Sequence, residues 1–174
     1  DLFRKTSKFK ILALHTTIEE LTELPIENKI SLKELPKADY LALGHIHQRR
    51  IEKVNPGMAV YPGPIWPCNF DELAQLNYGS FALVEVTANS GEYQIKVDLK
   101  PLKLKEIEKI ELDATDLSVS ELNTKLRDLL NKDFRDKILL LKVWGTLKDN
   151  SLINFEPDKL LNEINAYTVL KNFS

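Results

Sequence analysis

Three histidines are the residues of this chain whose type and spacing could do chemistry. His15 directly follows the apolar run at residues 11–14, and His45 and His47 follow a second apolar run at residues 40–43. The neutral imidazole nitrogen is a ligand for divalent metals such as zinc and manganese. The pattern therefore predicts that His15, His45 and His47 are metal ligands.

The elements that must position these histidines are two short strands. A continuous apolar run is typical of a strand that is covered on both faces of a parallel sheet. The carboxyl ends of such strands are where α/β proteins gather their ligands. In an extended segment, the spacing of His45 and His47 points both rings to one side, and Gly44 before them permits a close backbone approach.

A second interpretation of the histidines contains no metal. His45 and His47 could be an exposed pair on an edge strand, and His15 a hydrogen-bonded polar residue near a helix. A short motif by itself supports that interpretation, whereas a third histidine at another strand end favours a metal site. Three imidazoles could hold one zinc ion, but a two-metal phosphoesterase site also needs carboxylates. No Asp-x-His or Gly-Asp segment precedes His15 in the printed sequence.

Composition limits the classes of function. The chain has 174 residues, enough for one domain or a domain with a small appendage. Lys and Arg total 24 against 26 Asp and Glu, and the net charge of −2 excludes nucleic-acid binding by bulk positive charge, though not by a local patch. The single cysteine, Cys68, excludes an internal disulfide and a multi-cysteine zinc site. This cysteine usage favours a reducing, cytoplasmic or other intracellular location. No stretch approaches the ~18 apolar residues of a membrane helix.

Residues 1–99 are expected to form a sheet-based first domain. Residues 16–35 are interpreted as a loop with one short helix, and residues 69–72 as irregular. Strands are predicted at residues 59–61, 80–87 and 93–99. The last two are expected to form a hairpin, with Gly91 in its turn.

Residues 100–174 are expected to form a second domain, after a linker at Lys100 and Pro101. Strands are predicted at residues 110–112, 137–147 and 167–170. Two helices alternate with these strands in the expected β-α-β-α-β order. The predicted fold class is therefore α/β, with a small α+β second domain.

Local signals mark the two helices of the second domain. Ser118 and Glu121 have the spacing of a capping box, in which each side chain accepts a hydrogen bond from the backbone of the other. Leucines then recur at helical spacing. Pro157 predicts the first turn of the second helix.

Three segments of the first domain resemble one family. They read ILALH at residues 11–15, DYLALGHIH at residues 39–47 and VYPG at residues 60–63. The Gly-His-x-His element resembles the calcineurin-like metallophosphoesterase superfamily, and the longer phrases resemble the DNA repair nucleases of the meiotic-recombination-eleven or SbcD type. The resemblance implies that residues 1–99 are the C-terminal part of a phosphoesterase core, and that residues 100–174 are a DNA-contacting capping domain.

The resemblance also implies roles for the histidines. His15 and His45 match ligands of the second of two metal ions, usually manganese, and His47 matches a ligand of the first. Such enzymes hydrolyse DNA phosphodiesters, as exonucleases and endonucleases of double-strand-break repair. The family takes its other ligands from an N-terminal half without a counterpart here, so no catalytic residue is assigned. Because the sequence begins at Asp1 and its only methionine is Met58, we expect a piece of a longer protein, inactive by itself.

DNA and protein partners follow from the same resemblance. Arg49 and Arg50 come directly after the histidine segment, where they would contact a DNA phosphate; the alternative is an exposed pair that begins a strand. DNA ends, a coiled-coil ABC-type ATPase of the SbcC type and a homodimer through the N-terminal half are the implied partners. Basic residues of the second domain either add to a DNA surface or are solvated faces interleaved with acids: Lys100, Lys103, Lys105, Arg127, Lys132, Arg135 and Lys137.

Two other functions stay open. One is a non-catalytic DNA-binding or scaffolding fragment, which the missing ligands favour. The other is a calcineurin-like phosphoesterase for a small phosphate ester, against which the Tyr-Pro-Gly element and the second domain argue. Upstream Asp-x-His, Gly-Asp and Gly-Asn-His segments in the complete reading frame would favour the enzyme over the scaffold.

Overall fold

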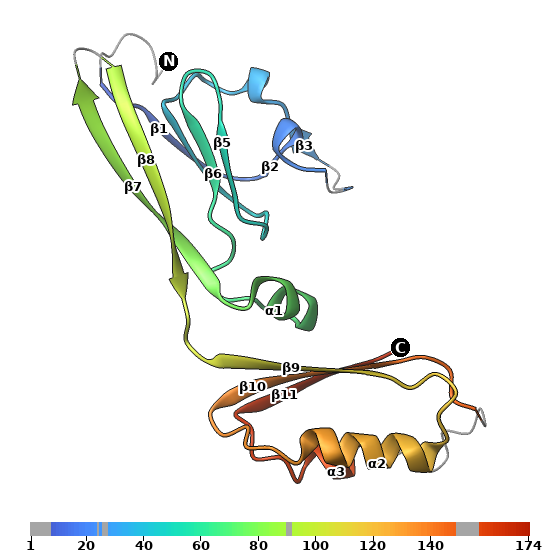
Figure 1. Ribbon diagram of the computed structural model, residues 1–174. Coiled ribbons are helices and arrows are strands. Elements are labelled where there is room, and N and C mark those ends of the chain that lie inside the picture. Colours follow the sequence, from blue (N-terminus) through green and yellow to red (C-terminus); the bar gives the residue numbers. More distant parts are fainter. Residues whose placement is uncertain (1–7, 24, 26–27, 90–91, 149–156) are drawn as a thin grey trace. The chain divides into compact units, whose positions relative to one another are not determined.

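The computed structural model describes residues 8–23, 25, 28–89, 92–148 and 157–174 (Figure 1). The chain divides into two compact units. Unit 1 holds the described residues up to Pro67 together with Tyr78–Leu102, and unit 2 holds those of Cys68–Asn77 and Lys103–Ser174. Several small parallel and antiparallel sheets and a few helices make this a mixed α/β protein, which confirms the predicted fold class at that level.

Unit 1 is built on a four-stranded sheet. Its strands, in spatial order, are β1 (Ile11–His15), β4 (Tyr40–Gly44), β6 (Met58–Tyr61) and β5 (Arg50–Lys53). β1, β4 and β6 run parallel, and β5 runs antiparallel to β6. The two strands predicted to precede the histidines are thus confirmed, and they are neighbours in the sheet.

β1 differs from the fully covered strand that its apolar run predicts. Its residues are alternately exposed and half-buried, and Ile11 keeps 59% of its surface exposed. Leu12 and Leu14 pack against the core of unit 1, where Leu41 and Leu43 of β4 are buried. This alternation follows from the position of β1, which is the last strand at one edge of the described sheet and has only one covered face.

The segment between β1 and β4 covers the core of unit 1. It forms two short parallel strands, β2 (Thr17–Ile18) and β3 (Lys29–Ile30), and two 3-10 helices, η1 (Glu19–Leu21) and η2 (Leu32–Glu34). Ile18 is fully buried in that core. The prediction of a loop with one short helix missed the β2–β3 pair, because strands of two residues carry no periodic signal.

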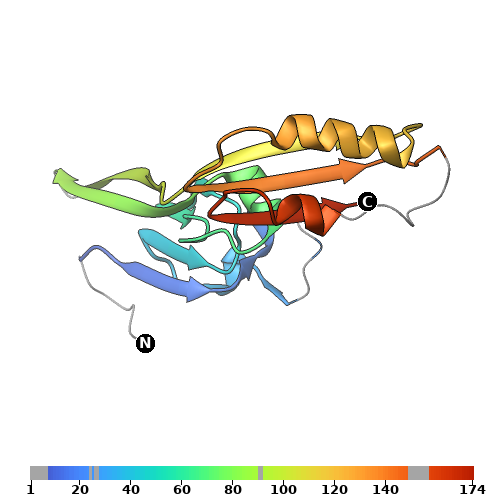
Figure 2. The same ribbon diagram turned by 90° about the horizontal axis from the view of Figure 1, so that it is seen from below.

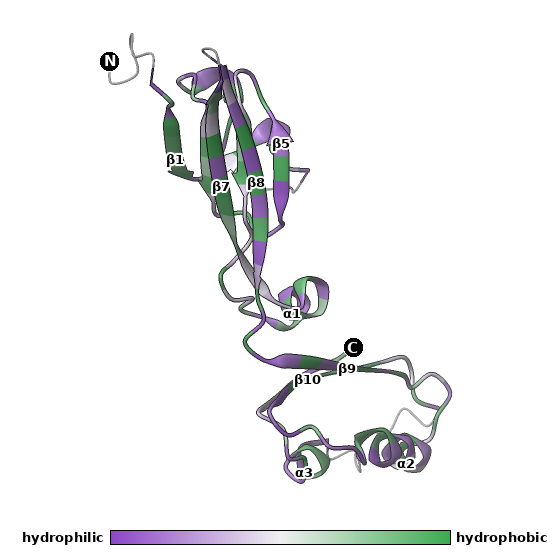
Figure 3. Cartoon of the chain, turned by 60° about the vertical axis from the view of Figure 1, so that its left-hand side comes forward, coloured by the Kyte–Doolittle hydropathy of each residue, from purple (hydrophilic) through white to green (hydrophobic). Residues whose placement is uncertain are grey.

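A long hairpin completes unit 1. β7 (Gly79–Asn89) pairs antiparallel with β8 (Glu92–Leu102), and hydrophobic and hydrophilic residues alternate along both strands in Figure 3. The predicted hairpin is confirmed, although Gly91 lies outside the described residues. β8 continues through Pro101, where the sequence predicts a linker. In a two-stranded sheet each strand has one edge without a neighbouring strand. A proline is tolerated on such an edge strand, because no N–H donor is needed there.

From Glu106 on, unit 2 has the β-α-β-α-β order that the sequence predicts. Strands β9 (Glu106–Asp113), β10 (Lys137–Trp144) and β11 (Thr168–Phe173) form a parallel sheet with β10 at its centre. α2 (Val119–Leu130) and α3 (Pro157–Leu161) lie on one side of this sheet (Figure 1). Figure 2 shows α2 running along the sheet.

β10, which confirms the strand predicted at residues 137–147, is covered on both faces. On one face Leu139 belongs to the same buried cluster as Leu126 of α2. On the other face Ile138 packs with Leu73 of α1 (Phe70–Leu76). Two covered faces explain why β10 is apolar without alternation.

Side-chain caps determine where the helices begin. The predicted capping box of α2 is confirmed, with Ser118 and Glu121 each accepting a backbone hydrogen bond from the other. The prediction that residues 69–72 are irregular is wrong, because α1 begins at Phe70 with Asn69 as its N-cap. The Asn69 side chain accepts a hydrogen bond from the Glu72 N–H at 2.9 Å, and this Asn-x-x-Glu spacing is the signal that could have revealed the helix.

Candidate metal centre

Two of the predicted ligands, His15 and His45, lie side by side. Residue His15 is opposite Gly44 in the parallel pairing of β1 and β4, so both strands end at the same level. The two imidazole rings have centroids 5.3 Å apart and planes inclined at 65°. Both residues are exposed. At this separation one metal ion could bind a nitrogen of each ring, at the ~2.1 Å typical of zinc–imidazole bonds.

The backbone at His45 has an unusual conformation. Its φ is +88°, a region in which non-glycine residues are uncommon. The next residue, Ile46, is only 5% exposed and packs in the core of unit 1. His45 and His47 on either side of this anchor are exposed. Strained backbone of this kind persists only where the surroundings hold it, and it clusters at binding sites.

Asp39 holds the start of β4 against the residue before β1. Its carboxylate accepts a hydrogen bond from the Lys10 N–H at 2.7 Å, and its own N–H donates to the Lys10 carbonyl at 2.9 Å. The two strands therefore enter the sheet in register. Asp39 stands directly before the apolar run at residues 40–43, and no local pattern predicts its role.

Tyr61 holds the segment that follows His15. Its side chain is fully buried, and its hydroxyl donates to the Thr16 carbonyl at 2.9 Å and accepts from the Ile18 N–H at 3.0 Å. Burial raises the pKa of Tyr61 above its ordinary value. Tyr61 belongs to the VYPG segment, and only the fold shows that it holds the main chain directly after His15.

The main chain of His47 lies against the VYPG segment. Its carbonyl oxygen is 3.2 Å from the place where a Cβ on Gly63 would lie, and Gly63 has φ +80°. Among the described residues, no three or more His, Cys, Asp or Glu side chains are grouped so that they could hold a metal ion. The structure thus brings His15 and His45 together, and it does not add His47 to them as a third ligand.

The histidine pair fits part of a metal site. Two neutral imidazoles supply nitrogen ligands without charge, and each sits at the end of a strand that packing and hydrogen bonds position. A complete site needs further donors, and carboxylates are the groups that would balance the charge of two divalent ions. This donor set is consistent with His15 and His45 sharing one ion.

Arg49 and Arg50 make different contacts within unit 1. Arg49 donates from Nε to the Ser80 hydroxyl at 2.7 Å and from Nη2 to the Tyr78 carbonyl. Arg50 donates to the Leu21 carbonyl at 2.7 Å and pairs with Glu52 at 3.0 Å. Both guanidinium groups are therefore partly engaged inside the protein, and their contact with phosphate stays a prediction.

Several of the basic residues in the predicted second domain form ion pairs. These pairs are Lys100 with Asp98, Lys105 with Asp136, Arg135 with Asp133, and Lys137 with Glu106. Hydrogen bonds from Arg135 hold the pKa of Asp133 at about 2. For these four basic residues the pairs favour solvated, mixed-charge surface over a DNA contact.

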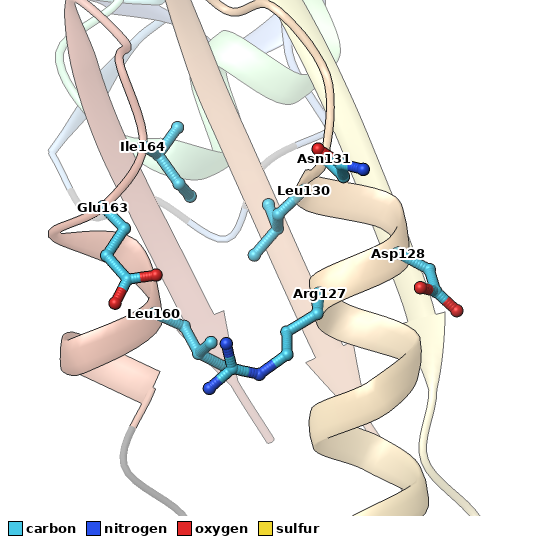
Figure 4. Close-up of a pocket in the computed structure, with 7 residues that line it drawn as sticks. All are labelled: Arg127, Asp128, Leu130, Asn131, Leu160, Glu163 and Ile164. Atoms are coloured by element: carbon cyan, nitrogen blue, oxygen red, sulfur yellow. The ribbon is translucent and has the colours of Figure 1, made fainter.

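Unit 2 carries a cavity of about 340 Å³ between α2 and α3 (Figure 4). Figure 4 shows Arg127 of α2 reaching toward Leu160 of α3, and Asp128 turned away. Leu130 and Ile164 contribute further apolar surface, and Glu163 lies at the opposite rim. This lining is a mixture of apolar and oppositely charged groups, which does not resemble a metal-ligand set.

These observations define a mixed α/β protein with a histidine pair where two parallel strands end. The chain is distantly homologous to the DNA double-strand break repair protein Mre11 over most of its length. It is 32% identical to Mre11 of Methanocaldococcus jannaschii over 157 residues, which cover 86% of this chain and 41% of that protein. With Mre11 of Archaeoglobus fulgidus it shares 22% identity over 147 residues, 82% of this chain and 33% of that protein.

The homology confirms the family resemblance that the three sequence segments indicate. The chain spans less than half the length of these two relatives. No family model matches the chain. Among the described residues, no helix is long and apolar enough to cross a membrane.

Proposed function

We propose that this chain is part of a manganese-dependent DNA nuclease of the Mre11 type, which hydrolyses phosphodiesters at DNA ends during double-strand-break repair. The observation that carries the proposal is the pairing of His15 and His45 at the ends of neighbouring parallel strands, 5.3 Å between ring centroids. Residues 1–99 would be the C-terminal part of the phosphoesterase core. Residues 100–174 would be its capping domain.

The chain's own residues would position metal ligands. His15 and His45 would hold one ion, and His47, beyond the buried Ile46, would hold the other. Bound manganese would supply Lewis-acid stabilisation and an activated water for phosphodiester hydrolysis. The pairing of β1 with β4 and the anchors at Asp39 and Tyr61 fix the backbone that carries the two histidines.

DNA would approach the same end of unit 1. Arg49 and Arg50 follow the histidine segment, and we propose that they lie close enough to contribute to phosphate binding. The proposed partners are DNA ends, a coiled-coil ABC-type ATPase and a second copy of the complete protein. The names of the two relatives support only the link to double-strand-break repair.

Manganese titration of the chain tests the ligand assignment. Paramagnetic Mn²⁺ broadens the NMR signals of nuclei near its binding site, so the imidazole signals of His15, His45 and His47 are the direct readout. We expect histidine-selective broadening at weak, submillimolar to millimolar affinity, with His15 and His45 responding together and His47 separately. The His15 effect should be lost in His45→Ala. Glu111→Gln, which removes an exposed carboxylate of unit 2, serves as the control and should leave the broadening unchanged.

A nuclease assay tests the division of the site. Because the chain offers three neutral ligands near the proposed centre, we expect little cleavage of double-stranded DNA ends with Mn²⁺ from these 174 residues alone. Efficient manganese-dependent cleavage by this chain would contradict the proposal that other ligands come from elsewhere. DNA binding without any histidine-selective manganese effect would instead favour the scaffolding function.

A further inference from the structure

Arg49 connects three parts of unit 1 that are distant in sequence. Its Nε donates to the Ser80 hydroxyl at 2.7 Å, and its Nη2 donates to the Tyr78 carbonyl. Its guanidinium carbon lies 4.6 Å from the centroid of the Tyr78 ring. These contacts join the end of the histidine segment to the beginning of β7.

Ser80 continues this connection to the VYPG segment. Its side chain is 2% exposed, and its hydroxyl donates to the Pro62 carbonyl while it accepts from Arg49. The Cγ of Arg49 is 3.0 Å from the place where a Cβ on Gly63 would lie. Arg49 therefore packs directly on the Pro62–Gly63 backbone, the same backbone that the His47 carbonyl approaches.

The histidine segment is consequently held at three points. Its beginning is fixed by Gly44, the last residue of β4, and its middle by the buried side chain of Ile46. Its end is fixed by Arg49, two residues after His47. His45 and His47 occupy the exposed positions between these anchors.

We propose that Arg49 is a positioning residue, which sets the place of His47 through its contacts with Ser80 and Tyr78. The inference rests on the proposed function, because it concerns the metal affinity of the same site. Arg49 would act through the backbone of the segment, so no direct contact of its guanidinium with an ion is required. This role differs from the phosphate contact predicted from the sequence.

Arginine is required at this position for a geometric reason. Its planar guanidinium donates in two directions and stacks on an aromatic ring at the same time. A lysine would keep the charge but could not reproduce the fixed fork that reaches both the Ser80 hydroxyl and the Tyr78 carbonyl. Arg49→Lys is thus a conservative test, which separates the geometry of the contacts from the charge.

The experiment compares Arg49→Lys and Ser80→Ala with the parent chain, and Arg135→Lys serves as the control. Arg135 also makes several side-chain hydrogen bonds, to Asp133 in unit 2. The readouts are the Mn²⁺ affinity from histidine broadening, and the amide and imidazole shifts of His47 without metal. Both test variants should lower the Mn²⁺ affinity read from the His47 signals about tenfold, the scale of lost supporting contacts at metal ligands, and both should shift the metal-free His47 signals.

Each outcome decides a separate question. The double variant that combines Arg49→Lys with Ser80→Ala should lose about as much Mn²⁺ affinity as Arg49→Lys alone, because the two substitutions break the same network. A folded Arg49→Lys with unchanged His47 signals and unchanged Mn²⁺ affinity would overturn the positioning role. If the parent chain shows no histidine-selective Mn²⁺ effect, the proposed function fails, and the metal-free His47 signals alone decide the role of Arg49. If Ser80→Ala does not fold, Arg49→Lys alone tests the proposal.

Discussion

The Nδ1 atom of His15 lies 2.9 Å from the position that a Cβ on Gly44 would take. The two residues are opposite each other in the parallel pairing of β1 and β4. The ring of His15 therefore occupies space that is open only because residue 44 has no side chain. This space lies beside His45, whose ring is 5.3 Å away between centroids.

Gly44→Ala should disturb the metal site while sparing the fold. The added Cβ must displace the His15 ring, so we expect Mn²⁺ affinity to fall about tenfold, the scale at which misplaced metal ligands act. The displaced group is the end of a side chain, and the structure shows no positive φ at Gly44. The thermal unfolding midpoint should therefore stay within a few degrees of the parent. Manganese titration and thermal unfolding check the two effects.

Gly57→Ala is the matched control for that substitution. A Cβ on Gly57 would lie 1.8 Å from the backbone oxygen of Asp39, so the chain between β5 and β6 must move. We expect a loss of about 2 kcal/mol or more in the free energy of unfolding, by overpacking against backbone. Equal effects of the two alanines on stability would show that the clash at Gly44 is not confined to the His15 ring.

His45→Gly should be more stable than His45→Ala. Both variants lose the imidazole, but only glycine relieves the strain of φ +88° at this position. The difference in free energy of unfolding is expected to be about 1 kcal/mol in favour of glycine. Urea denaturation measures it. If alanine proves equally stable or more stable, the backbone at residue 45 is not held in the strained conformation.

Tyr61→Phe should destabilise unit 1 without changing the chemical identity of any histidine. The substitution removes two hydrogen bonds and leaves the Ile18 N–H without this acceptor in a buried place. The expected cost is about 1–3 kcal/mol. Tyr167→Phe, at a residue that keeps 63% exposure, is the control and should change the unfolding midpoint little. A neutral Tyr61→Phe would mean that water replaces the hydroxyl at no cost.

The stability of the chain should fall at alkaline pH. Burial raises the pKa of Tyr40 and of Tyr61 above the ordinary value of 10.0. A raised folded-state pKa gives a stabilisation that is complete below the unfolded-state pKa and is lost as pH rises through the folded-state value. We therefore expect the free energy of unfolding to decrease above about pH 10. Lysines also titrate there, so the test is a shallower decrease in Tyr61→Phe than in the parent, measured by urea denaturation from pH 8 to 11.5.

Elements with strong local signals were predictable from the sequence. The capping box of Ser118 and Glu121 marks the beginning of α2 because both hydrogen bonds join residues three positions apart. The apolar run at residues 138–141 lies in the strand predicted at residues 137–147, and β10 is that strand. In both cases the physical cause lies within a few residues of the signal.

Elements whose environment comes from distant residues were predicted less well. β1 has as apolar a sequence as β4, but its place at the sheet edge leaves one face exposed. Pro101 suggests a break in the chain, yet β8 continues through it because β7 pairs with it. The residues of a strand do not by themselves determine whether it lies at a sheet edge or which strand pairs with it.

The candidate metal centre shows the same division. The sequence by itself determined that three histidines follow apolar runs, that glycines stand at positions 44 and 63, and that the segments resemble one family. Only the tertiary structure decided that His15 and His45 meet, because their contact depends on the parallel register of β1 and β4. It also decided that Arg49 binds Ser80, 31 residues later in the chain. Such long-range contacts form when the core of unit 1 packs, and no local pattern encodes which residues that packing brings together.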